Sequence, residues 1–384
     1  MHARKLVVVA VAAASTTGLA LPAVAAPTHR TAIGTVTVVA SGLNNPRGLT
    51  WAHGKLWLAE GGHGGTDCPT GATGPDGGPL CFGPTSSIDV VAPGKVTRVV
   101  TGLLSFAGAN GAGAEGAEGI AAATKGLSVV FGESVVGLFS SFPATAHMTA
   151  SDDKLARAEL GRLSSVVGHA VTSIADVGDS DYSWTAVHKS LVPDQYPDAN
   201  PNAVLTVGTT TYVADSGANT LDAVDAAGNV TQLAFIPNNG ASDGVPTCVA
   251  AGPDGKLYIG ELAPGAAPNG GNVYTYNPKT KKLHRWKTGF NVVDGCGFDA
   301  AGNFYAVELQ AHGFNPGPTG DPSGDVIKIA KNGTRTVLGK GKLNFPQGFA
   351  TDGKHHLYVS NWSLMPATPL APGGPTGQVV QIAI

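Results

Sequence analysis

The chain has 384 residues, with 24 Lys and Arg against 27 Asp and Glu, which gives a formal net charge of −3 at pH 7. This mild acidity argues against nucleic acid or an anionic lipid surface as the partner. Charged residues make up only 13% of the chain, and its 54 Gly follow no three-residue period, which excludes collagen and favours a turn-rich β protein.

The first 25 residues have the pattern of a secretory signal peptide. Arg4 and Lys5 precede an apolar stretch from Leu6 to about Ala14, and small residues then lead to an Ala23-Val24-Ala25 cleavage site. The apolar stretch is well short of the roughly 20 residues that a membrane span needs. Cleavage after Ala25 leaves 24 − 2 = 22 cations against 27 acids, a balance of −5. We therefore expect a secreted protein, extracellular or periplasmic, with no membrane span.

The rest of the chain contains six copies of one repeat. The copies are residues 46–60, 117–133, 201–215, 246–261, 293–308 and 346–361. Three copies align without a gap, and the other three lose or gain one residue in a turn. Each copy joins two short apolar runs by a tight turn, which is typical of a β-hairpin.

A third strand follows every copy, and a fourth strand follows all copies except the last. The last copy ends at Ile384 after its third strand, whereas the strand-like segment 34–41 stands alone before the first copy. Such a displaced strand is what a closed ring of blades requires, because it completes the last sheet. The sequence therefore predicts an all-β, six-bladed β-propeller of four-stranded antiparallel blades, forming a single domain over residues 26–384. A β-sandwich would explain neither the period nor the displaced strand.

The lengths of the connections predict two different faces. Strands within a blade alternate in direction, so the 1–2 and 3–4 turns lie on one face and the 2–3 and 4–1 connections on the other. The long connections all belong to the second face: 61–85, 134–160, 178–200, 262–270, 309–323 and 362–376. We expect a plain face and a loop-bearing face, and variable loops on a rigid scaffold commonly recognise ligands. The alternative is that these loops only shield strand ends.

Aromatic and His side chains in these loops are candidate ligand contacts. They include His63, Trp184, His312 and Trp362. Such side chains beside flexible polar residues suit sugars, peptides or flat aromatic molecules. The expected partner is therefore a small molecule, glycan or protein on the loop-bearing face, and we expect a monomer.

A polar residue ends the second strand of every repeat at the loop-bearing face. These residues are Glu60, Glu133, Asp215, Glu261, Glu308 and Asn361. Such a ring could hold a hard cation such as calcium through oxygen ligands, or supply an acid and a base. Each side chain could instead accept N–H bonds from the following turn in its own blade, and this structural role best explains why every repeat has one.

Four Cys suit an exported chain. Cys68 and Cys81 lie in one Gly/Pro-rich loop and are predicted to form a local disulfide. Cys248 and Cys296 lie in equivalent parts of successive repeats, and either a disulfide or two separate buried thiols would fit. No C-x-x-C pair supports a zinc site, and no H-E-x-x-H, G-x-S-x-G or P-loop motif is present.

The stretches "DANPNAV" (198–204), "YVADSGANTL" (212–221) and "GVPTCVAAGPDGKLYIGEL" (244–262) resemble the ScyD/ScyE family of exported proteins, which is related to NHL-type propellers. The resemblance runs over nearly the whole mature chain. It implies a secreted or periplasmic six-bladed propeller, and it offers no catalytic residues to transfer. The family usually has a small residue such as Ser where Cys248 stands, and this departure favours a Cys248–Cys296 bond.

Two functions follow as hypotheses. The first is a secreted binding or scaffolding module that uses the long loops of one face. The alternative is a calcium-dependent hydrolase or lactonase at the central channel, suggested by the carboxylate ring and Asn361. A quinone-dependent sugar dehydrogenase has little support, because the repeats offer few His and cationic side chains. No cofactor is assured.

Overall fold

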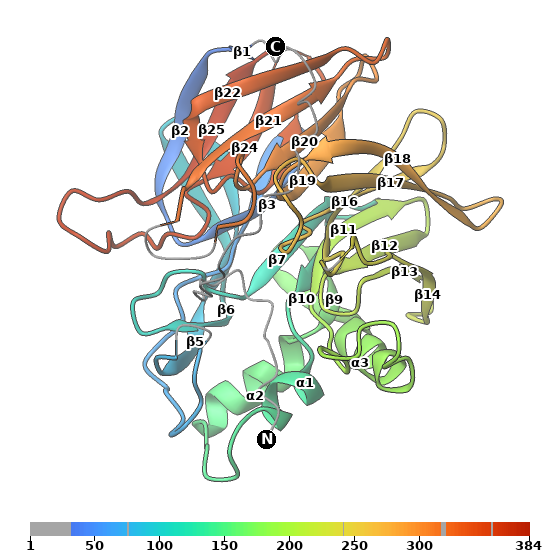
Figure 1. The fold of residues 1–384 in the computed structure, drawn as a ribbon. Coiled ribbons are helices and arrows are strands. Elements are labelled where there is room, and N and C mark those ends of the chain that lie inside the picture. The colour runs from blue at the N-terminus through green and yellow to red at the C-terminus, as the bar shows by residue number, and fades with distance from the viewer. Residues whose placement is uncertain (1–31, 75–76, 241, 316–319, 355) are drawn as a thin grey trace, which may run out of the picture.

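The protein is a closed ring of six antiparallel β-sheets (Figure 1). The computed structural model describes residues 32–384 except 75–76, 241, 316–319 and 355. The predicted signal peptide, residues 1–25, lies outside the described residues. None of the helices in the described ranges has the length and apolar character of a membrane-spanning segment.

The first three blades follow the repeats in chain order. Blade 1 comprises β3 (Pro46–Ala52), β4 (Lys55–Glu60), β5 (Leu80–Ala92) and β6 (Lys95–Gly108). Blade 2 comprises β7 (Ala117–Ala122), β8 (Leu127–Phe131), β9 (Arg162–Val167) and β10 (Ala170–Asp176). Blade 3 comprises β11 (Pro201–Val207), β12 (Thr210–Asp215), β13 (Thr220–Val224) and β14 (Val230–Phe235).

The last three blades include the one that the N-terminus completes. Blade 4 comprises β15 (Pro246–Ala251), β16 (Leu257–Glu261), β17 (Gly271–Asn277) and β18 (Lys282–Phe290). Blade 5 comprises β19 (Val293–Phe298), β20 (Phe304–Glu308), β21 (Ser323–Ile329) and β22 (Arg335–Asn344). Blade 6 comprises β23 (Phe349–Thr351), β24 (His356–Asn361), β25 (Gly377–Ala383) and β2 (Val36–Leu43).

The predicted ring closure is confirmed. β2 pairs antiparallel with β25, in a register that runs from Val36 opposite Ile382 to Leu43 opposite Gly377. A second pairing of the N-terminal segment was not predicted from the sequence: the short strand β1 (Ala32–Ile33) pairs in parallel with β22 of blade 5. The N-terminal segment therefore joins the edges of two blades, and Figure 1 shows it beside both.

The apolar core lies between the blades. Each of six clusters combines buried residues from two neighbouring blades, as where Ile88 of blade 1 meets Val129 of blade 2. Val273 of blade 4 meets Ile327 of blade 5 in the same way. Because one blade alone would expose both apolar faces to water, each blade depends on its neighbours for burial.

The prediction that the long connections are loops was wrong for two of them, which contain helices. Residues 134–160 contain α1 (Val135–Ser140) and α2 (Ala150–Glu159), and the connection after blade 2 contains α3 (Val177–Val187). Figure 1 shows the three helices on one side of the ring. Strand β5 begins six residues before the predicted residue 86, because the β5–β6 hairpin continues beyond the blade.

The hairpin extension and the two helices of blade 2 share an apolar core of their own. Its buried members include Phe82, Phe106, Leu138 and Leu160. We call residues 61–85, 103–108 and 134–160 the insertion lobe. Phe82 lies in the predicted long loop 61–85, but it is fully buried in this core, stacked on Phe106 with ring centroids 5.3 Å apart. The lobe is therefore a packed unit, and its aromatic content serves packing.

Candidate functional site: the central channel

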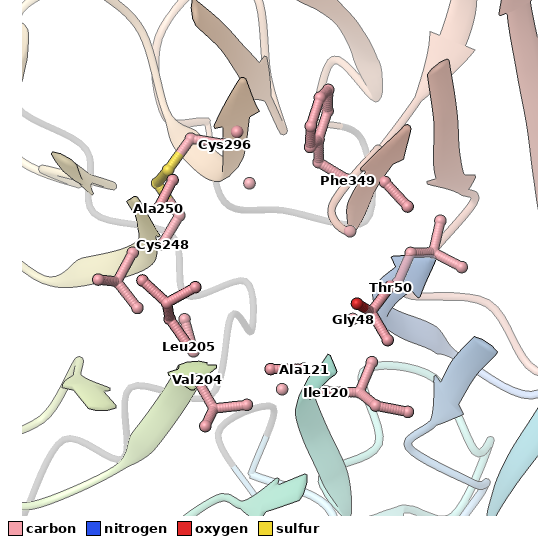
Figure 2. Close-up of a pocket in the computed structure, with 18 of the residues that line it drawn as sticks. Gly48, Thr50, Ile120, Ala121, Val204, Leu205, Cys248, Ala250, Cys296 and Phe349 are labelled. Carbon is pink, nitrogen blue, oxygen red and sulfur yellow. A yellow bond between two sulfur atoms is a disulfide. The ribbon is translucent and has the colours of Figure 1, made fainter. Parts of the chain in front are cut away.

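The first strands of the six blades surround a cavity of about 380 Å³ on the ring axis. Figure 2 shows its wall, to which all six blades contribute. The labelled residues are Gly48, Thr50, Ile120, Ala121, Val204, Leu205, Cys248, Ala250, Cys296 and Phe349. Most of these side chains are apolar, so the middle of the channel is an apolar tube. We call this cavity the channel pocket.

One end of the channel pocket carries a ring of polar residues. These residues are Arg47, Glu118, Asn202, Thr247, Asp294 and Gln347. Five of them are the second residue of a first strand, and Gln347 takes the corresponding place just before β23. All are buried except Asn202, which is half-buried. We call these six residues the polar floor.

Hydrogen bonds join part of the polar floor into a network. Nη1 of Arg47 donates to Oε1 of Gln347 over 2.9 Å, and Nη2 donates to the carbonyl of Ala114 over 2.5 Å. Nε2 of Gln347 in turn donates to Oδ2 of Asp294 over 2.6 Å. Nε of Arg47 lies 3.4 Å from Oε2 of Glu118, which is an ion pair but too long for a strong hydrogen bond. The guanidinium is therefore held by two hydrogen bonds and one ion pair, and its Nε makes no hydrogen bond within the described residues.

Besides Nε of Arg47, which makes no hydrogen bond within the described residues, two groups of the polar floor keep unused hydrogen-bonding capacity. Oδ1 of Asp294 accepts no hydrogen bond from the described residues. The side-chain amide of Asn202 likewise makes none within the described part of the chain. Both residues line the channel pocket, so these atoms are available to a ligand.

The electrostatics of the floor are set by burial. Burial raises the pKa of Asp294 to about 6, although Gln347 and Arg47 favour its ionised form. Burial and the neighbouring Glu118 raise the pKa of Glu115, just behind the floor, well above its ordinary value. Burial also disfavours the charge of Arg47, but the surrounding carboxylates outweigh this and raise its pKa. Perturbed groups of this kind concentrate at functional sites.

The channel pocket opens on the plain face. Along β3 the exposed fraction rises from 4% at Arg47 to 38% at Trp51. Ala122 and Ala251, at the same end of β7 and β15, are exposed. The segments that lead into the first strands at the other end are buried, with 5% exposure or less at Asn45, Glu115, Asn200 and Asn291. The loop-bearing end is thus closed by protein, and the polar floor is the bottom of the pocket.

Glycine after the floor position lets the first strands approach one another. A Cβ added to Gly295 would lie 2.1 Å from the carbonyl oxygen of Gln347, and one added to Gly348 would lie 2.3 Å from that of Arg47. Real Cβ atoms do not approach backbone this closely, so larger residues here would force the blades apart. The recurring small residue after the floor position therefore fixes the width of the channel.

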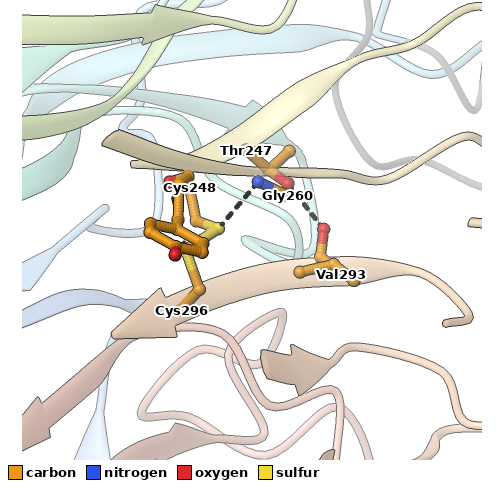
Figure 3. Close-up of a disulfide and its surroundings, with 6 residues drawn as sticks. Thr247, Cys248, Gly260, Val293 and Cys296 are labelled. Carbon is orange, nitrogen blue, oxygen red and sulfur yellow. Dashed lines mark hydrogen bonds between the residues drawn. A yellow bond between two sulfur atoms is a disulfide. The ribbon is translucent and has the colours of Figure 1, made fainter. Parts of the chain in front are cut away.

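Both disulfides form. Cys68 bonds to Cys81, as predicted, and ties the insertion lobe to β5. Cys248 bonds to Cys296 with a Cα–Cα distance of 5.7 Å, which decides the question that the sequence left open. Figure 3 shows this bond joining β15 of blade 4 to β19 of blade 5 in the wall of the channel pocket.

The polar residues predicted to end the second strands are all buried, and four of them hold the segments that lead into their blades. The backbone N–H of Asn44 donates to Glu60, and that of Asn200 donates to Asp215 over 2.7 Å. Blades 5 and 6 repeat the pattern: the backbone N–H of Asn291 donates to Glu308 over 3.0 Å, and that of Asn344 donates to Asn361 over 2.7 Å. In all four blades the donor is the backbone of an Asn in the leading segment.

The remaining two members have other surroundings. Oε1 of Glu261 accepts from the backbone N–H of Asn272 over 2.8 Å, and burial raises the pKa of Glu261 to about 7. Burial and the neighbouring Asp198 raise the pKa of Glu133 well above its ordinary value. Across the described residues, no three His, Cys, Asp or Glu side chains are grouped as metal ligands. The ring is thus spread over the blades and does not converge on one ion.

The four loop candidates contact residues of their own neighbourhoods. Trp184 of α3 stacks on His188, which caps the C-terminal end of that helix, with ring centroids 4.0 Å apart. Trp362 packs edge-on against Phe345 at 6.3 Å. The exposed His312 contacts Oδ2 of Asp321 at 2.7 Å, and His63 is exposed in the loop after β4. They come from separate blades, and the described contacts join no two of them.

Sequence reasoning missed the polar floor. Its signal was present in the repeat alignment, where the residue just before the small residue is polar in every copy. The position stood out less than the strand-ending carboxylate because six different residue types fill it. Only its place on the ring axis gives the six a common role.

No protein-family model and no curated protein matches the chain. A protein of unknown function from Bacteroides thetaiotaomicron has a similar structure, with 12% identity over 91% of this chain and 76% of that one and a TM-score of 0.53. A gluconolactonase from Xanthomonas campestris has 12% identity over 96% and 98%, with a TM-score of 0.46. Virginiamycin B lyase from Staphylococcus aureus has 13% identity over 92% and 100%, with a TM-score of 0.44. The first likeness bears on the fold alone, and the other two are too distant to carry an argument.

Proposed function

We propose that this protein is an exported β-propeller that binds a small molecule in the channel pocket. The observation that carries the proposal is the pocket itself: an apolar tube of about 380 Å³ that ends on a buried polar floor. Small-molecule sites typically have this size, are mostly apolar, and contain a few fixed polar groups that orient the ligand.

Binding is favoured over catalysis by the chemistry of the lining. Among the described residues that line the pocket there is no His, Ser or Lys. The hydroxyl of Thr247 donates to the carbonyl of Val293 over 2.5 Å, and both lining cysteines are in a disulfide. A nucleophile with an adjacent base is what covalent catalysis needs, and Thr247 and the two cysteines do not supply one.

The calcium-dependent lactonase alternative does not fit the side chains. It requires the strand-ending carboxylates to converge on one ion, whereas Glu60, Asp215 and Glu308 accept hydrogen bonds from their own leading segments. Oε1 of Glu60 also lies 3.0 Å from Nη2 of Arg98, so a cation of the protein already occupies that carboxylate. We derive no reaction through calcium.

The proposal moves the binding site away from the loop-bearing face. The longest insertions there pack into the insertion lobe, with their own apolar core and disulfide. Ligand contact by His63, Trp184, His312 and Trp362 stays a prediction, as does the place of the chain in the ScyD/ScyE family. Export is supported by the two disulfides, which are typical of oxidising compartments.

The test blocks the channel and compares the two faces. A panel of small molecules is screened by thermal shift, and each hit is then measured with Leu205→Trp, which enlarges a half-buried residue of the pocket wall. The matched control is Leu370→Trp, the same change at an exposed site of the last long loop. We expect hits to lose binding in the first variant and keep it in the second. Binding that survives Leu205→Trp and fails in Leu370→Trp would move the site to the loop-bearing face.

A further inference from the structure

We propose that the channel pocket selects an organic monocation, with an ammonium or amidinium group on the polar floor and an apolar body along the wall. This inference rests on the proposed function and names the ligand class of the same site. It follows from the charge of the floor, from its unused acceptors and from the aromatic residues at the mouth.

The polar floor has a net charge of −1 when both of its acids are ionised. Its only cation within the described residues is Arg47, and its acids are Glu118 and Asp294. Glu115 lies behind the guanidinium, and burial raises the pKa of its carboxyl, so it supplies no further positive charge to the floor. The remaining members, Asn202, Thr247 and Gln347, carry no charge. A buried charge is costly unless it is paired, so a ligand that brings one positive charge is favoured here.

Two of the unused polar atoms of the floor are hydrogen-bond acceptors. Oδ1 of Asp294 and the amide oxygen of Asn202 have no partner among the described residues. Both can accept from an ammonium or amidinium N–H, and a charge-assisted bond to a carboxylate is the stronger kind.

An anionic ligand is disfavoured by the state of Arg47. Both of its Nη atoms already donate to Gln347 and Ala114, and its Nε faces Glu118. A carboxylate that reached the remaining N–H groups of Arg47 would also lie beside the carboxylates of Glu118 and Asp294, which repel a second negative charge. The charge of the guanidinium is therefore already shared among carboxylates of the protein, which makes it a poor anion site.

Aromatic side chains stand at the mouth of the pocket on the plain face. Trp51 is 38% exposed and stacks on Tyr358, with ring centroids 5.7 Å apart. Phe298 and Phe349 line the pocket at the same level and are half-buried. Aromatic faces attract organic cations, and the apolar wall below them suits a hydrocarbon chain. A cation thus meets favourable groups from the mouth to the floor.

The test uses three probes of equal length and different charge: hexylammonium, hexanol and hexanoate. Binding is measured by calorimetry and by tryptophan fluorescence between pH 5 and 8. We expect hexylammonium to bind at least tenfold more tightly than the other two. Its affinity should rise with pH through about 6, because the ionised carboxylate of Asp294 binds the cation and the protonated one does not. Arg47, Glu118, Gln347, Thr247 and Asn202 are the other polar groups that face the pocket there, and the pH profile of hexanol reports any change in them.

Two variants and one matched control test which residues of the polar floor cause the preference for hexylammonium. Asp294→Asn should abolish the preference for hexylammonium, whereas Asp254→Asn, at an exposed turn of the plain face outside the pocket, should retain it. Asn202→Leu removes the second free acceptor without breaking a bond, and should weaken hexylammonium more than hexanol. The melting temperature of each variant reports folding independently.

The outcomes separate this inference from the proposed function. Equal binding of the three probes, lost in Leu205→Trp, would overturn the monocation inference and support the channel pocket as the binding site. Tighter binding of hexanoate, or a preference for hexylammonium that survives Asp294→Asn, would also overturn the inference. Binding that Leu205→Trp does not reduce would contradict the proposed function itself.

Discussion

Removing the Cys248–Cys296 disulfide should destabilise the whole propeller. The bond closes a separation of 48 residues, and the loss of chain entropy in the unfolded state gives about 4 kcal/mol of stabilisation for a loop of this length. Cys248 also belongs to the apolar cluster between blades 4 and 5, together with Val293 and Phe304. The variant with Cys248→Ala and Cys296→Ala should therefore unfold at a clearly lower guanidinium concentration, followed by tryptophan fluorescence.

The matched control is the variant with Cys68→Ala and Cys81→Ala. Its bond closes a separation of 13 residues, for which chain entropy alone gives about 3 kcal/mol. Because this bond ties only the insertion lobe, most of its effect should fall on local opening of the lobe, and the main transition should move by less than half as much. Equal shifts of the main transition in the two variants would refute the reasoning that the position of a disulfide in the ring decides its global effect. A shift below about 1 kcal/mol for the first variant would refute the chain-entropy estimate as well.

The other predictions concern channel width, pH and calcium. Gly348→Ala places a Cβ 2.3 Å from the carbonyl of Arg47 and should cost about 1–3 kcal/mol, whereas Gly265→Ala, whose nearest atom is 3.3 Å away, should change the melting temperature little. Burial raises the pKa of Glu261 to about 7, so the folded state holds this proton where the unfolded state has released it, and stability should fall by about 3 kcal/mol as pH rises from about 4.5 to 7. Glu261→Gln should flatten that decline in denaturant unfolding, and an unchanged slope would contradict the assignment. Added calcium should leave the melting temperature unchanged, and a saturable increase would show a cation site that the described side chains do not form.

The sequence repeat was sufficient to predict most of the fold. Each copy has two short apolar strands around a tight turn, and a single blade cannot bury both of its faces. The unfinished last copy and the lone segment before the first copy then specified ring closure, which the pairing of β2 with β25 confirms. The helices were missed because their apolar faces are short. In α1 only Val135 and Leu138 are buried, and they become meaningful only against the β5–β6 hairpin.

The strand-ending carboxylates show that a local sequence pattern predicts the position of a side chain but not all of its hydrogen-bond donors. The sequence placed Glu60, Asp215 and Glu308 at equivalent positions, and it offered a structural role beside a metal site. It named the following turn as the donor, and for Asp215 two such donors are present, Gly217 and Ala218. The donor that recurs is instead the Asn leading into the blade, which lies 15 to 17 residues before the acceptor in these cases and 17 before Asn361.

The sequence by itself determined the number of blades, their order and their closure, because these depend on a local pattern repeated along the chain. The tertiary structure alone decided which polar groups meet. Arg47 and Gln347 are 300 residues apart and hydrogen-bond because closure of the ring brings the first and last blades together. The same closure sets Asp294 beside them and joins Cys248 to Cys296. A site on the axis of a ring draws one residue from each blade, and no local stretch of sequence contains more than one of them.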